Sequence, residues 1–214
     1  MKNMKGLDAH VKRVTVALTV AALVQAGSAL AALELRDING NATAIAVDAE
    51  FAYDTALGAT WYLTANNTGL NWNEAKNWAA GLTVGIFSGW SLPATDPGCG
   101  GAPQCTGSQV EQLYYWTLGN AFGGLLSNTG PFKNLLSYTY WLSTAAMDDF
   151  GDPSYAWAFS TRDGLSGILR KDFLLYALAI RPGDVAAVPE PGTVALLLSG
   201  LAGVMAMRRR QIKA

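Results

Sequence analysis

The 214-residue sequence predicts an α+β fold, with two helices packed on a mainly antiparallel sheet between two terminal targeting segments. Two stretches near the middle of the chain place apolar residues at helical spacing behind a capping residue. Three later runs alternate apolar and polar residues and are separated by turn-forming residues, as in antiparallel strands. Once the two ends are set aside, about 157 residues remain, which suits one domain.

The N-terminal 31 residues are typical of a signal peptide. Four basic residues precede an uncharged, mostly apolar run from Val14 to Val24. Ala29-Leu30-Ala31 then supplies the small residues of a cleavage site, with the cut expected before Ala32. We therefore assign residues 1–31 to a signal peptide and expect the protein to be exported.

Residues 32–59 are expected to form a leader with one possible strand, because Asn41 to Tyr53 alternates only loosely. The run from Thr60 to Thr64 is β-branched and aromatic, which predicts the first strand of a domain spanning residues 60–187. The segment Asn66 to Gly69 is predicted to be a turn.

Leu70 to Leu82 is the clearest helix. Asn71 can cap its N-terminus, and Glu74 follows at the spacing of a capping box. The apolar face of this helix is more typical of a core-facing side than of a ligand platform, and it consists of Trp72, Ala75, Trp78, Ala79 and Leu82.

Gly107 to Leu118 is predicted to be the second helix. Ser108 is the expected N-cap, and Glu111 stands at the position of its capping-box partner. Val110, Leu113 and Tyr114 supply the apolar face.

Cys99 and Cys105 are the two cysteines of the chain. An exported protein meets an oxidising compartment, so a disulfide between them is expected. Closing this small ring stabilises the fold by about 2 kcal/mol in the chain-entropy model. Two thiolates with no further soft ligand do not make a zinc site.

Three strand-like runs complete the domain. They span Ser137 to Thr144, Ser154 to Thr161, and Phe173 to Arg181. The turn at Asp163-Gly164 and the loops between the runs favour an antiparallel arrangement.

Residues 188–214 have the composition of a membrane-sorting segment. Pro189, Glu190 and Pro191 precede an uncharged run from Thr193 to Met207, and three arginines follow it. As a helix, these 15 residues span about 22 Å, against about 30 Å for the hydrocarbon core of a bilayer. The segment is therefore short for a permanent membrane span.

The order of triplet, apolar run and basic cluster resembles the PEP-CTERM sorting signal. The resemblance implies recognition by an exosortase, a membrane protease-transpeptidase of Gram-negative bacteria that make extracellular polysaccharide. It also implies transient insertion in the inner membrane, removal of the tail, and a mature protein at the cell surface or outside the cell. By this resemblance Pro189, Glu190 and Pro191 form the recognition motif, and Arg208, Arg209 and Arg210 form the retention signal.

A series of short motifs between Thr60 and Pro182 resembles the Lcl C-terminal-like domain, a bacterial family of largely unknown function. The resemblance implies a C-type-lectin-like fold and supplies no catalytic residues. Ser91 and Leu142 depart from the pattern, where an arginine and a small polar residue are usual. The motifs are Leu70-Asn71-Trp72-Asn73-Glu74-Ala75 leading to Trp78-Ala79, Gly89-Trp90-Ser91-Leu92-Pro93, Glu111-Gln112-Leu113, Tyr140-Trp141-Leu142-Ser143-Thr144, Ala156-Trp157-Ala158-Phe159 and Ile180-Arg181-Pro182.

Charge and histidine content exclude several kinds of function. Residues 32–188 hold 14 acidic and 7 basic residues, a net charge of −7, which argues against binding nucleic acid or polyanionic glycans. The single histidine, His10, lies in the signal peptide. The domain therefore has no histidine for a catalytic triad, a metal site or general base catalysis, and we expect no cofactor.

Two aromatic residues and one acidic loop are candidate ligand sites. Trp141 and Trp157 could stack on sugars, although alternation alone does not tell which face of a strand is exposed. Asp148, Asp149 and Asp152 could hold calcium, but a solvated acidic loop is the simpler interpretation. A carboxylate pair could hydrolyse glycosides, and the available acids are Glu74, Glu111, Asp148, Asp149 and Asp163.

Three functions remain open from the sequence. The leading hypothesis is a non-catalytic binding module associated with extracellular polysaccharide. The second is a purely structural surface or matrix protein, which would self-associate. The third is a carboxylate-dependent glycosidase, which would show two acids close together in a cleft.

Overall fold

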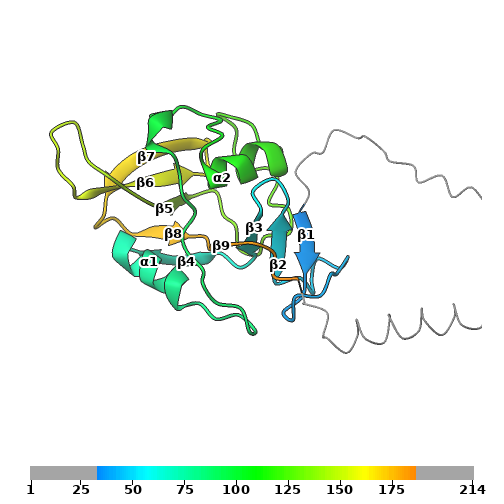
Figure 1. The fold of residues 1–214 in the computed structure, drawn as a ribbon. Coiled ribbons are helices and arrows are strands. Elements are labelled where there is room, and N and C mark those ends of the chain that lie inside the picture. Colours follow the sequence, from blue (N-terminus) through cyan, green and yellow to red (C-terminus); the bar gives the residue numbers. More distant parts are fainter. Residues whose placement is uncertain (1–32, 187–214) are drawn as a thin grey trace, which may run out of the picture.

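The computed structural model describes residues 33–186, which form two β-sheets with helices packed on them (Figure 1). The expected α+β class and the mainly antiparallel pairing are confirmed. The signal peptide, the Pro-Glu-Pro motif and the arginine cluster lie outside the described residues. Within residues 33–186, no helix has the length and apolar character needed to cross a bilayer.

The first sheet corrects the expectation of a leader before residue 60. Its four strands are antiparallel in the order β1-β2-β3-β9, so the segment before residue 60 contributes two full members. An alternating pattern is hard to recognise before residue 60, because β1 and β2 have only four residues each. The strands are β1 (Leu33–Arg36), β2 (Phe51–Asp54), β3 (Ala59–Tyr62) and β9 (Ile180–Pro182).

A partly buried ion pair ties the first strand to the end of the domain. Arg36 donates to both carboxylate oxygens of Asp184, from Nε at 3.2 Å and from Nη2 at 2.7 Å. Arg36 is 8% exposed, and the two residues are 148 positions apart. This bidentate geometry makes residues 33–59 part of the same folded body.

The second sheet has five strands in the order β4-β8-β5-β6-β7. All neighbours in it are antiparallel except β5 and β8, which are parallel. The strands are β4 (Asn66–Leu70), β5 (Thr139–Ala146), β6 (Tyr155–Ser160), β7 (Leu165–Arg170) and β8 (Leu175–Ala177).

Three sequence predictions about this sheet were wrong. The segment from Asn66 to Gly69 is part of strand β4, because it pairs with β8 through an irregular register. Strand β7 was missed. The single run predicted from Phe173 to Arg181 divides into β8 and β9, which belong to different sheets.

Both faces of the five-stranded sheet are covered, one by α1 (Trp72–Gly81) and the other by α2 (Gln109–Glu111) and its continuation (Figure 1). Trp141 packs with α1, whereas Trp157 packs with α2. Because successive strand residues point to opposite faces, the two tryptophans of adjacent strands are separated by the sheet. In this part of the sheet, therefore, neither β5 nor β6 has a face exposed to solvent.

The capping residues of both helices are as predicted. Asn71 Oδ1 accepts from Glu74 N at 3.0 Å, and Glu74 Oε2 accepts from Asn71 N at 2.9 Å, which completes the capping box. Ser108 caps α2 by accepting from Glu111 N at 3.4 Å. After α2 the chain widens into a π-helical segment, Gln112–Thr117, in which Leu118 N donates to Leu113 O.

Candidate functional site

A pocket of about 470 Å³ lies where three segments distant in sequence meet. The disulfide loop forms one side, the end of β5 and the loop after it form another, and strands β6 and β7 form the floor. We call this the Trp157 pocket. It is lined by Pro97, Gly100, Gly101, Ala145, Ala146, Met147, Asp149, Trp157, Ser166, Gly167 and Ile168.

Of the two predicted tryptophans, the structure places only Trp157 at this pocket. Trp141 is fully buried, and its Nε1 donates to Leu70 O at 2.9 Å, so the prediction of Trp141 as a sugar platform was wrong. Trp157 is 9% exposed, so it offers the pocket a limited apolar surface on the floor and not a free ring face.

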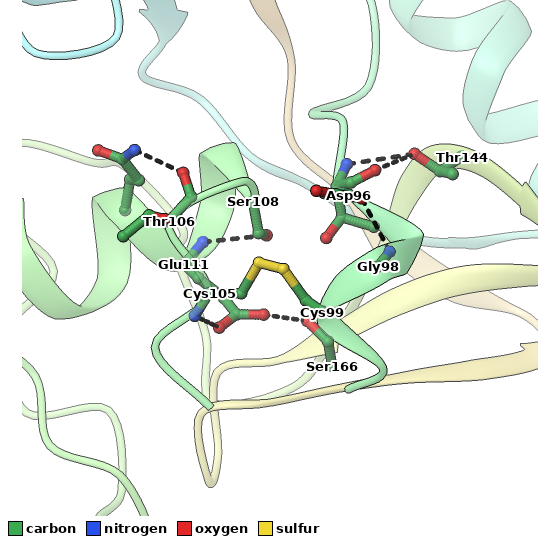
Figure 2. Close-up of a disulfide and its surroundings, with 11 residues drawn as sticks. Asp96, Gly98, Cys99, Cys105, Thr106, Ser108, Glu111, Thr144 and Ser166 are labelled. Atoms are coloured by element: carbon green, nitrogen blue, oxygen red, sulfur yellow. Dashed lines mark hydrogen bonds between the residues drawn. A yellow bond between two sulfur atoms is a disulfide. The ribbon is translucent and has the colours of Figure 1, made fainter. Parts of the chain in front are cut away.

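The disulfide shapes the adjoining wall (Figure 2). Cys99 and Cys105 are bonded, with a Cα–Cα distance of 5.9 Å. Asp96 caps the short 3₁₀ turn Pro97–Cys99 by accepting from Gly98 N at 2.8 Å. Just before it, the hydroxyl of Thr144 accepts from Thr95 N and donates to Thr95 O, which fastens the loop to β5.

Gly101 allows the disulfide loop to lie directly against β7. Its φ of 79° is in the left-handed region, where glycine is strongly favoured. A Cβ at this position would be 3.0 Å from the carbonyl oxygen of Ser166 and 3.9 Å from Cζ3 of Trp157. A larger residue would therefore push the loop away from the floor of the pocket.

Glu111 holds the disulfide loop in place through hydrogen bonds. The prediction that its side chain is the capping-box partner of Ser108 was wrong. Its side chain does not return to Ser108. Oε2 accepts from Cys105 N at 2.7 Å, and Oε1 accepts from the Ser166 hydroxyl at 2.5 Å. The carboxyl group thus links the disulfide loop to strand β7 (Figure 2).

Burial governs the ionisation of this group. Glu111 is fully buried, and burial raises its pKa above the ordinary value, with partial opposition from the bonds donated by Ser166 and Cys105. Burial, with a further contribution from the charge of Glu111, raises the pKa of the neighbouring Tyr115 to about 12. Tyr115 remains protonated at neutral pH and donates to Gly164 O.

The acidic loop between β5 and β6 uses its carboxylates mainly to hold its own shape. Asp148 Oδ1 accepts from Phe150 N and Asp152 N, and Asp152 Oδ1 accepts from Ser154 N. Asp149 lines the Trp157 pocket. Within residues 33–186, no three side chains among His, Cys, Asp and Glu gather as metal ligands would.

The lining of the pocket carries a single acidic side chain. Among the described residues that line it, Asp149 is the one ionisable side chain, and no lysine or arginine is present. Such a lining disfavours anionic ligands and accepts neutral or cationic ones.

Sequence reasoning identified Trp157, Asp149 and the two cysteines, but it did not bring them together. It missed Ser166 and Gly101 as parts of the site. Ser166 lies in the strand that was not predicted, and Gly101 lies between the two cysteines, in a loop to which the sequence assigned no site. No local pattern marks either residue, because each acts through a contact with a distant segment.

The family model of the PEP-CTERM protein-sorting motif matches residues 187–210. The predicted sorting motif is therefore confirmed, and it indicates an exported protein that is processed by an exosortase. The matched residues follow the described domain, so the match concerns the destination of the protein and not the Trp157 pocket. No curated protein matches the chain.

Proposed function

We propose that the mature protein is a non-catalytic module that binds extracellular polysaccharide in the Trp157 pocket. The observation that carries this proposal is the convergence of Trp157, Asp149 and the disulfide loop on one pocket. The sorting motif supports the destination, because it directs the protein to the cell envelope or surface.

The lining of the pocket suits a sugar. Trp157, Met147 and Ile168 provide apolar surface for the C–H faces of a sugar ring. Asp149 and Ser166 provide oxygen atoms at the same pocket for hydroxyl groups. The exposed lining of the pocket is more polar than apolar, which suits a ligand with many hydroxyl groups, and 470 Å³ is within the usual range of size of small-ligand sites.

The charge of the pocket narrows the class of polysaccharide. A uronic acid would bring its carboxylate beside Asp149 with no basic residue in the lining to balance it. We therefore expect neutral sugars, or sugars with a free amino group, and not a uronate-rich chain.

The use of the acidic residues supports a non-catalytic role. Glycoside hydrolysis requires two available carboxyl groups. Four of the five candidates accept hydrogen bonds from within the chain: Glu74, Asp148 and Asp163 from backbone N–H groups near the surface, and the buried Glu111 from Ser166. Asp149 is the candidate left at the pocket.

The decisive experiment is co-sedimentation of the purified intact chain with polysaccharide extracted from its own host, in a detergent without a sugar head group. We expect saturable binding by the wild type. Met147→Arg should weaken it at least tenfold, because Met147 lines the pocket and is 66% exposed. The longer, charged side chain therefore obstructs the pocket without removing core packing.

Phe150→Arg is the matched control, since Phe150 is 96% exposed in the same loop and does not line the pocket. Equal binding by Met147→Arg and the wild type would reject the Trp157 pocket as the site. Reducing sugar released during the assay would instead support the glycosidase. Self-association without binding would favour the structural role, and a gain in binding with calcium that EDTA reverses would favour a cation at the Asp148–Asp152 loop.

A further inference from the structure

A second pocket, of about 290 Å³, lies where the end of β3, strand β4 and the end of α1 come together. It shares no lining residue with the Trp157 pocket. We call it the Trp78 pocket. The side chains on which the argument depends are Tyr62, Thr64, Asn67, Thr68 and Trp78.

Two aromatic residues at this pocket are only half covered. Trp78 is half-buried, whereas Trp72, Ala75 and Ala79 of the same helix are buried in the core. Tyr62, at the end of β3, is also half-buried. Trp78 packs against the core, as expected, and it also lines a pocket, together with an aromatic residue from a different element. Rings of this kind offer an apolar face to a sugar while remaining partly in water.

One polar atom in this pocket has no partner. Asn67 Oδ1 is buried and makes no hydrogen bond within the described part of the chain. The neighbouring Asn66 differs, because its Oδ1 accepts from Thr68 N at 2.8 Å. A buried acceptor without a donor is uncommon in a folded protein, and this one belongs to a residue that lines the pocket.

The remaining lining is polar and uncharged. Thr64 and Thr68 each bring a hydroxyl group that can both donate and accept. No lining residue of this pocket is ionisable at neutral pH. Aromatic faces, hydroxyl groups, an amide and no charge together fit a neutral, polyhydroxylated ligand.

We propose that the Trp78 pocket is a second saccharide subsite for a neutral sugar, so that one domain holds two stretches of polysaccharide and can cross-link chains. The ligand class rests on the proposed function, whereas the site itself rests on Asn67 and the two aromatic residues. A donor group of the bound sugar, a hydroxyl, satisfies Asn67 Oδ1, and the ring lies against Trp78.

The test uses oligosaccharides of two to six sugars, prepared by partial hydrolysis of the host polysaccharide, titrated calorimetrically into the intact chain. We expect two molecules bound per chain for the wild type, and one for either Trp78→Ala or Met147→Arg. Mixtures with the intact polysaccharide should scatter light strongly only when both pockets are functional, because cross-linking needs two sites per chain.

Thr68→Arg is a second variant of the Trp78 pocket, which keeps the test valid if Trp78→Ala fails to fold. Thr68 is exposed at the rim of the pocket, so the long arginine side chain obstructs the entrance without removing core packing. Ser88→Arg is the matched control, because Ser88 is exposed and lines neither pocket. Unchanged thermal unfolding of both variants shows that the fold is retained.

The outcomes separate this inference from the proposed function. If the wild type binds one oligosaccharide per chain, and this binding is lost in Met147→Arg but retained in Thr68→Arg and Trp78→Ala, the second subsite is overturned and the first is kept. If binding is lost in Thr68→Arg but retained in Met147→Arg, the Trp78 pocket is kept and the Trp157 pocket is rejected. No binding to the wild type overturns both.

Discussion

The carboxyl group of Glu111 and the hydroxyl of Ser166 lie 2.5 Å apart, although 55 residues separate them in the sequence. Through this bond, and a second from Cys105 N, one buried side chain joins the disulfide loop to the floor of the Trp157 pocket. The shape of the pocket therefore depends on an acid that does not itself line it.

Glu111→Gln should change how stability depends on pH. The folded-state pKa of Glu111 is raised above its ordinary value of 4.5, chiefly by burial, so the folded protein holds this proton more tightly than the unfolded chain. The stability contributed by the protonated acid is full below pH 4.5 and is lost as the pH rises through the folded-state pKa.

Urea unfolding of both proteins between about pH 4 and 8 measures the effect. We expect the stability of the wild type to fall relative to Glu111→Gln as the pH rises, because glutamine does not titrate. Parallel profiles, or a rise in the relative stability of the wild type, would show that the carboxyl group is not buried as described.

Removing the disulfide should weaken both the fold and the Trp157 pocket. Cys99→Ala/Cys105→Ala is expected to lose about 2 kcal/mol of unfolding free energy, through the greater entropy of the unfolded chain. Polysaccharide binding should fall as well, because Gly100 and Gly101 lie inside the ring and line the pocket. Reductant should reproduce these losses in the wild type and leave the double variant unaffected. Full binding by the reduced protein would mean that the loop keeps its position without the bond.

Gly101→Ala and Gly100→Ala form a matched pair in that loop. Both glycines have positive φ, 79° and 58°, so each alanine costs about 1 kcal/mol in backbone conformation. Only at Gly101 does the new Cβ approach within 3.0 Å of Ser166 O, whereas at Gly100 it meets nothing within 4 Å. Gly101→Ala should therefore be the less stable variant in thermal unfolding and the weaker binder. Equal effects would show that the loop does not press against β7.

Asn67→Ala and Asn66→Ala test the unpartnered acceptor in the Trp78 pocket. Asn66→Ala removes the bond to Thr68 N and should lose about 1 kcal/mol of stability. Asn67→Ala removes a buried acceptor that has no donor within the described residues, so it should be neutral or stabilising when no sugar is added.

The two measurements for this pair are thermal unfolding without sugar and calorimetric titration with the oligosaccharide. Asn67→Ala should weaken the second binding event even though the fold is at least as stable. A clear loss of stability in Asn67→Ala would mean that its side chain already has a structural partner.

Features encoded by neighbouring residues could be predicted from the sequence. The capping box of α1 depends on Asn71 and Glu74, which are three residues apart, and the Ser108 cap is equally local. The cysteine pair closes a ring of a few residues, so the pairing followed directly once export was inferred. The sorting motif is a continuous stretch and was found for the same reason.

The sequence does not show which element each face of a strand packs against, because this depends on the segments that cover the sheet. Trp141 and Trp157 have similar surroundings in the sequence, yet one packs with α1 and the other with α2 and the pocket. Likewise, the run from residue 173 to 181 is continuous in sequence but serves two sheets, since its partners are β4 and β5 in one and β3 in the other.

Short-range hydrogen bonds and composition encode the cellular destination of this protein, its α+β class, the helix starts and the cysteine pair, so all four could be inferred from the amino-acid sequence. Three results required the folded structure: residues 33–59 belong to the domain, Glu111 accepts a hydrogen bond from Ser166, and Trp157 and Trp78 line separate pockets. Each of these is a contact between segments tens of residues apart, and neither partner has a defined neighbour until the chain has folded.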